Sequence, residues 1–148
     1  TVKTGHVKTD EYVRAYNQSL ATIHNPGYFE IKWRWWEAAA MGCLNISPVI
    51  KPLSWLGYKP WFHYIPVSTE ETSDGPWPDI KESISVLSEI KSSRPFFQQI
   101  ADDARFYTLK NHTYYHRCQT IFTDLGLRNM AEKAQERIDV AWKEHLGE

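Results

Sequence analysis

The fold depends on residues 28–64, which read YFEIKWRWWEAAAMGCLNISPVIKPLSWLGYKPWFHY. This aromatic segment (residues 28–64) holds ten of the chain's 21 aromatic residues but only six charged side chains. Rings that combine an apolar body with a polar tip are common at protein interfaces and at the water edge of a membrane. The segment therefore predicts a surface that contacts a partner.

The start of the aromatic segment fits two conformations. Residues 29–35 alternate between apolar and charged side chains, as a half-buried strand does. Phe29, Trp33 and Trp36 also recur at the spacing of one face of a helix. Because residues 36–41 have high helix propensity and no second strand pattern lies nearby, helix is preferred and strand stays the alternative.

Four prolines lie in the second half of the segment and just after it, at Pro48, Pro52, Pro60 and Pro66. They argue against a continuous helix or a central strand, so we expect residues 46–66 to form an extended, turn-rich crossing. Residues 38–58 contain one charge and have the nominal length of a membrane span. Their polar residues and prolines favour a segment that lies on a partner or at a membrane edge, and entry into the membrane stays open.

Helical patterns flank the aromatic segment on both sides. Apolar side chains recur at three- and four-residue spacing from residue 9 to residue 23, and Asn25 then begins a turn. Similar stripes predict helices over residues 80–92, over 96–125 with a break near His112, and over 127–146. The predicted fold is mostly α, a helical bundle or hairpin joined to the extended proline- and aromatic-rich crossing.

Composition divides the chain into three parts. Residues 1–66 contain the N-terminal helices and the interaction segment, residues 67–79 form an acidic linker, and residues 80–148 form the C-terminal helical region. The chain has 148 residues and 17.3 kDa, so the parts are expected to make one structural unit that buries roughly 70% of its unfolded surface.

Charge and cysteine content exclude several classes of protein. A net charge of −1 and a pI near 6.6 argue against nucleic-acid binding, which usually shows a basic stripe. Two cysteines, Cys43 and Cys118, are too few for the disulfide framework of a small secreted domain.

The best candidates for a metal site are His112, His116 and Cys118. Two histidines four residues apart share one face of a helix, and zinc accepts imidazole and thiolate ligands. The pattern lacks the intervening Glu of the zinc-protease motif, and Cys118 lies about 200° around an ideal helix from His116. Two partly exposed structural histidines are the preferred interpretation, and no metal or cofactor is expected.

Signs of catalysis are weak throughout the sequence. Cys43 has apolar neighbours, whereas a reactive thiol needs an electropositive setting, so a buried side chain is expected there. None of the seven glycines is paired in a phosphate-binding loop. The sequence therefore predicts a protein that is not an enzyme.

The leading functional hypothesis is a non-catalytic accessory or structural subunit of a larger multiprotein assembly, with other subunits as partners. The aromatic belt, the few cysteines and the first residue Thr1 in place of Met favour an organelle, most plausibly the mitochondrial inner membrane. One alternative is a small metal-binding helical protein or enzyme that uses His112 and His116, and another is a soluble ligand-binding module with a Trp-lined pocket. The expected interaction residues are Trp33, Arg34, Trp35, Trp36, Trp55, Tyr58, Trp61, Phe62 and Tyr64.

Overall fold

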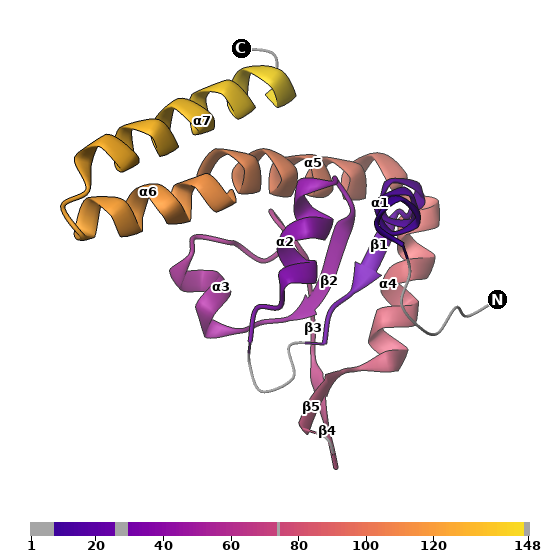
Figure 1. Ribbon diagram of the computed structural model, residues 1–148. Coiled ribbons are helices and arrows are strands. Elements are labelled where there is room, and N and C mark those ends of the chain that lie inside the picture. The colour runs from indigo at the N-terminus through magenta and orange to yellow at the C-terminus, as the bar shows by residue number, and fades with distance from the viewer. Residues whose placement is uncertain (1–7, 26–29, 74, 147–148) are drawn as a thin grey trace. The chain divides into compact units, whose positions relative to one another are not determined.

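The computed structural model describes residues 8–25, 30–73 and 75–146 (Figure 1). Contacts divide the chain into two compact units, Thr1–Ala104 and Arg105–Glu148. The prediction of a mostly α fold is confirmed, because helices make up most of the described chain. The first unit adds a small sheet that the sequence analysis did not predict.

Three parallel strands form this sheet in the order β1-β2-β3. β1 is Ala21–Ile23, β2 is Leu44–Pro48 and β3 is Ile65–Val67. The Leu44 amide donates to the Leu20 carbonyl at 3.2 Å, and the His24 amide donates to the Ile46 carbonyl at 2.8 Å. β1 is therefore tied to β2 at both of its ends.

The expectation that prolines keep residues 46–66 out of a central strand is wrong, because β2 is the middle strand of the sheet. Pro48 is the last residue of β2, and Pro66 lies in the edge strand β3. A proline costs little at the end of a strand or on an edge, where its missing N–H is not needed by a neighbour. Pro48 and Pro66 are thus compatible with the sheet.

The first helix, α1, is Thr9–Gln18 and is shorter than predicted. The Ser19 hydroxyl donates to the Ala15 carbonyl at 2.6 Å where the helix ends. The following residues were expected to continue the helix but pair with β2 instead. Parallel pairing with a fully buried strand has overridden the helical spacing of Leu20 and Ile23.

Helix α2 is Trp33–Ala40, so the helical interpretation of the aromatic segment holds from Trp33 onward. Residues 30–32 have no regular secondary structure, and Phe29 lies outside the described residues. Gly42, with φ of 73°, follows the helix and turns the chain into β2. Only glycine adopts this left-handed conformation without strain, which makes Gly42 a suitable helix terminator.

Alternation along β2 places different side chains on the two faces of the sheet. Leu44 and Ile46 belong to an apolar core shared with α4 (Ile80–Ser92) and the first half of α5 (Arg94–Asn111). Asn45 lies on the opposite face, where its side-chain amide donates to the Trp35 carbonyl in α2 at 3.1 Å. Both faces are covered by helices, which explains why every residue of β2 is buried.

The connection after β2 contains the short helix α3, Lys51–Trp55. After β3, the segment expected as an acidic linker contains an antiparallel hairpin of β4 (Thr69–Thr72) and β5 (Gly75–Pro78). Asp79 caps α4 by accepting from the Glu82 amide at 2.9 Å, and the Glu82 carboxylate accepts from the Ser68 amide at 2.6 Å. These bonds hold the end of β3 against the start of α4.

The second unit consists of the end of α5, α6 (Tyr114–Asp124) and α7 (Arg128–Leu146). A break separates α5 from α6 near His112, as the sequence predicts. α6 and α7 pack side by side (Figure 1). The rings of Phe106 and Trp142 meet edge to face at 5.2 Å, and the Lys110 ammonium lies over both of them.

Candidate functional site

The most distinctive site lies where β1 and β2 end and α2 begins. Because the strands of the sheet are parallel, their carboxyl ends share one edge, and ligands of open α/β sheets bind outside this edge. His24 directly follows β1, Ser47 is near the end of β2, and Lys32 directly precedes α2. The chain thus brings three polar side chains to one place from distant parts of the sequence.

A small pocket opens at this carboxyl edge. It is a shallow depression, because its empty volume of about 170 Å³ includes space open to solvent, and the room between the side chains is far below that of a typical small-molecule site. The pocket can therefore accept one small polar group rather than a large ligand. The residues that line it are His24, Glu30, Ile31, Lys32, Trp35, Ser47 and Ile50.

His24 is the most unusual side chain of the carboxyl-edge pocket. It is only 7% exposed, and its Nε2 atom makes no hydrogen bond within the described residues. Burial, with smaller contributions from the positive charges of Arg34 and Lys32, lowers the pKa of His24 to about 4, although a hydrogen bond with the Arg34 backbone acts in the opposite direction. The imidazole is therefore neutral at pH 7, and its Nε2 is available to a bound group.

The amino terminus of α2 adds positive potential to the same pocket. Lys32 is the N-cap residue and makes no side-chain capping bond, and the first turn of α2 contains no acidic residue. Lys32 and Arg34 instead place two cations where the helix dipole is already positive. This combination of charges and unused backbone N–H groups is typical of an anion-binding site.

Three further polar atoms behind the pocket have no partner in the described part of the chain: Trp35 Nε1, Asn45 Oδ1 and Tyr64 Oη. The Trp35 ring connects them to the pocket, since its centroid lies 5.3 Å from that of His24 and 5.2 Å from that of Tyr64. Buried polar groups are nearly always hydrogen-bonded. Buried polar atoms without a partner in the described residues thus lie both at the pocket and in the interior next to it.

The structure separates the nine predicted interaction residues into groups. Trp35, Tyr58 and Tyr64 are buried within the first unit, each at most 2% exposed. Trp36 is partly buried, and its ring lies 5.6 Å from the ring of Tyr58. Of the nine residues, Trp35 alone lines the carboxyl-edge pocket. The exposed residues are Trp33, Arg34, Trp55, Trp61 and Phe62, and contact between them and a partner stays a prediction.

The predicted metal candidates are engaged in other contacts. His116 Nδ1 accepts from the Thr113 amide at 3.2 Å and so forms part of the cap of α6. His112 Nδ1 lies 3.1 Å from an Arg117 guanidinium nitrogen. In the described ranges of the chain, no three His, Cys, Asp or Glu side chains gather as a metal would require.

Two other sequence expectations concern Cys43 and the membrane. Cys43 is 1% exposed as predicted, and burial raises the pKa of its thiol to about 11, so it is not a nucleophile at neutral pH.

Residues 38–58, considered as a membrane span, form the end of α2, β2 and α3. Across the three described ranges, none of the helices combines the length and hydropathy that crossing a bilayer requires.

Comparison with protein families finds one family that the chain matches. Residues 1–123 match the family described as glycosyl transferase-like, and this region includes the whole sheet and the carboxyl-edge pocket. The chain belongs to the glycosyl transferase-like family. No curated protein and no solved structure matches it.

Membership of the glycosyl transferase-like family corrects the expectation that the chain is not an enzyme, because the family points to sugar transfer. Nucleophiles, metal ligands and glycine-rich loops have recognisable sequence patterns, and the carboxyl-edge pocket uses none of them. No motif therefore pointed to His24 and Lys32. The available signal was the alternation of apolar and polar residues from Leu44 to Ser47 between Gly42 and Pro48, which is the period of a strand.

Proposed function

We propose that this glycosyl transferase-like chain takes part in sugar transfer, and that its carboxyl-edge pocket binds a phosphate group of the activated sugar donor. The observation that carries the proposal is the uncapped, cationic amino terminus of α2 beside the buried, unpartnered Nε2 of His24. The family match over residues 1–123 supports the class of reaction.

The reaction explains why an anion site is needed. An acceptor oxygen forms a bond to the anomeric carbon of the sugar while the bond from that carbon to the donor phosphate oxygen breaks. The phosphate leaves with the electron pair, and the acceptor hydroxyl releases its proton to water. Negative charge therefore develops on the phosphate, and fixed positive groups that face it lower the barrier.

The pocket offers three kinds of contact to such a phosphate. Lys32 provides charge in the pocket and Arg34 provides it nearby, and the N–H groups of Trp33 and Arg34 at the start of α2 can provide directed hydrogen bonds. The other ring nitrogen of His24 is used by the hydrogen bond to the Arg34 backbone, so Nε2 can donate one further bond when the imidazole takes up a proton beside the bound anion. The burial of His24 makes its own bond stronger than it would be in water, whereas Lys32 and Arg34 are exposed.

Glu30 gives the pocket an acidic group beside these cations. Its carboxylate repels a phosphate but accepts hydrogen bonds from hydroxyl groups. Lys32 balances the charge of Glu30 among the residues that line the pocket, and Arg34, whose charge also acts on His24, adds a second cation nearby. This arrangement suits a ligand that carries both a phosphate and hydroxyl groups, as an activated sugar does.

The proposal can be tested by calorimetric titration of the full chain with inorganic pyrophosphate and with nucleoside diphosphates. Removal of both cations in the variant Lys32→Gln/Arg34→Gln should weaken binding about tenfold or more, because bonds to charged groups are lost. Lys81→Gln, which removes an exposed cation from α4, is the matched control and should bind as the native chain does. Equal affinity in all three proteins would overturn the assignment of the site.

A further inference from the structure

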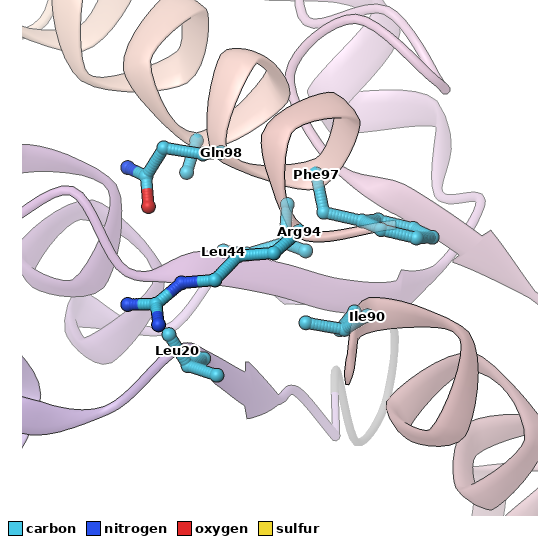
Figure 2. Close-up of a pocket in the computed structure, with 7 residues that line it drawn as sticks. Leu20, Leu44, Ile90, Arg94, Phe97 and Gln98 are labelled. Atoms are coloured by element: carbon cyan, nitrogen blue, oxygen red, sulfur yellow. The ribbon is translucent and has the colours of Figure 1, made fainter. Parts of the chain in front are cut away.

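The two units of the chain differ in the amount of core that each possesses. In the first unit, Leu44 and Ile90 belong to the apolar core between the sheet and the helices (Figure 2). In the second unit, burial is described for residues 105–144, and among these only Thr108 and Ala134 are buried. Helices in proteins gain most of their stability from the packing of an apolar face. Much of the apolar surface of the second unit is still exposed.

The exposed apolar surface of α6 is a stripe of four residues, here called the α6 stripe. Tyr114, Ile121 and the C-cap residue Leu125 are 69%, 54% and 67% exposed, and Cys118 is partly buried. Their spacing of four, three and four residues keeps all four side chains on one face of a helix. All of α6 is described, and none of its residues is buried. The α6 stripe is therefore open to a partner that lies along the helix.

The α6 stripe is symmetric about its centre, because its spacing reads the same in both directions along the helix. A second copy of α6 that packs in the antiparallel direction is related to the first by a two-fold axis near the middle of the helix. Tyr114 of one copy then faces Leu125 of the other, and Cys118 faces Ile121. A two-fold interface requires a self-complementary surface of this kind.

The charges beside the α6 stripe are complementary in the same arrangement. Arg117 lies near the start of α6 and Asp124 ends it, and their spacing of seven residues puts them on the same side of the stripe. Both charges oppose the dipole of their own helix, which favours acidic residues at its start and basic residues at its end. In an antiparallel pair, Arg117 of each copy lies within about one helical turn of Asp124 of the other, where the two charges attract.

We propose that the α6 stripe binds a second copy of this chain in the antiparallel orientation. The palindromic spacing of the apolar residues and the two flanking charges both favour a copy of the chain as the occupant. The contact covers one face of a single helix, which is less than the roughly 800 Å² per partner of a standard stable interface. The dimer is therefore weak, with a dissociation constant on the order of 100 µM.

Sedimentation equilibrium of the full chain between about 10 µM and about 1 mM measures this association. We expect the mass to rise from that of the 17.3 kDa monomer toward that of a dimer. Ile121→Glu places a charge in the centre of the α6 stripe and should weaken the dimer at least tenfold, because the interface would bury an unpaired carboxylate. Val140→Glu is the matched control on α7, at a position that is 46% exposed, and should leave the affinity unchanged.

The variants Arg117→Glu and Asp124→Arg test the antiparallel geometry. Each variant alone brings like charges together across the interface, so each should associate at least several-fold more weakly than the native chain. In an equimolar mixture, the acidic side chain introduced at position 117 faces the basic one introduced at position 124. The unchanged Arg117 and Asp124 face each other as well, so the mixture should recover the native affinity. A structural defect in either variant would persist in the mixture.

Three results would overturn the proposal. One is a native chain that stays monomeric over the whole range of concentrations, which would mean that the α6 stripe is covered by its own chain or by another protein. Another is association that survives Ile121→Glu but is lost in Trp55→Ala, which would place the contact on the first unit. The third is a mixture of the two charge variants that associates as weakly as either variant alone. The readout requires no sugar transfer, so its result is independent of the function proposed for the carboxyl-edge pocket.

Discussion

Trp33 and Trp35 are two residues apart on the same helix, yet Trp33 is 73% exposed and Trp35 is 2% exposed. Two residues along a helix turn the side chain by about 200°, so one ring faces outward and the other faces the sheet. The same division runs through the aromatic segment, where Tyr58 and Tyr64 join Trp35 inside and Trp55 and Trp61 lie outside. Aromatic content alone therefore does not identify an interaction surface.

The buried half of the aromatic segment should dominate stability. Trp35→Ala removes a ring that packs edge to face on both Tyr58 and Tyr64, and leaves a cavity in the interior. We expect the free energy of unfolding to fall by about 3–5 kcal/mol, as measured by urea denaturation.

Trp33→Ala is the matched control for Trp35→Ala, with the same chemical change on the same helix. Because its ring is exposed, the change in stability should stay within about 0.5 kcal/mol. Comparable losses in the two variants would contradict the division of the segment into buried and exposed halves.

Acid should destabilise the first unit through His24. The pKa of His24 is lowered to about 4 in the folded chain, whereas an unfolded histidine has its ordinary value near 6.5. Between these values the unfolded state binds a proton that the folded state does not. Stability is thus complete above pH 6.5 and is lost as the pH falls toward 4, by up to about 3 kcal/mol.

The contribution of His24 is obtained by measuring the free energy of unfolding of the variant His24→Gln over the same pH range. Burial also lowers the pKa values of His63 and His116, so both proteins retain some loss of stability in acid. The variant should show a flatter profile than the native chain. Parallel profiles would mean that His24 does not titrate as a buried, neutral imidazole.

A smaller effect is expected at Tyr64, which is fully buried and whose hydroxyl has no partner in the described residues. Burial raises the pKa of this hydroxyl to about 12. Tyr64→Phe removes an unsatisfied polar group and keeps the ring, so thermal denaturation should show unchanged or higher stability, by about 1 kcal/mol. A clear loss of stability would show that the hydroxyl is hydrogen-bonded, for instance to a buried water.

The smallest effects are expected at the exposed rings outside α2. Trp55 and Phe62 are 79% and 62% exposed, so alanine at either position should change the free energy of unfolding by about 0.5 kcal/mol or less. Size-exclusion chromatography of these variants also tests the predicted partner surface. If these exposed rings hold copies of the chain together, the alanine variants should elute later, as monomers. A large loss of stability at either position would place these rings in a core.

The helical part of the fold could be predicted because its signals are local. The apolar spacing of α4, its Asp79 cap and the break near His112 all lie within a few residues of the elements they define. The sheet could not be predicted in the same way. β1 and β3 have three residues each, too few for a periodic pattern, and they are held by pairing with a distant strand.

The candidate site was missed for a related reason. His24, Lys32 and Ser47 come together only because parallel strands end at a common edge, and no motif in the sequence joins them. The anion site depends on backbone N–H groups at a helix end, which carry no residue signature. The buried environment that makes His24 unusual is likewise a property of the folded chain.

The central claim is that the amino terminus of α2 and His24 bind a phosphate group. Its most direct test is a titration of the ¹⁵N-labelled chain with pyrophosphate, followed at the amides of residues 33–35 and at the His24 ring. We predict saturable shifts at both places and a higher pKa for His24 in the bound state, because a nearby anion favours the imidazolium. Saturating pyrophosphate that leaves these signals and the His24 pKa unchanged would contradict the account.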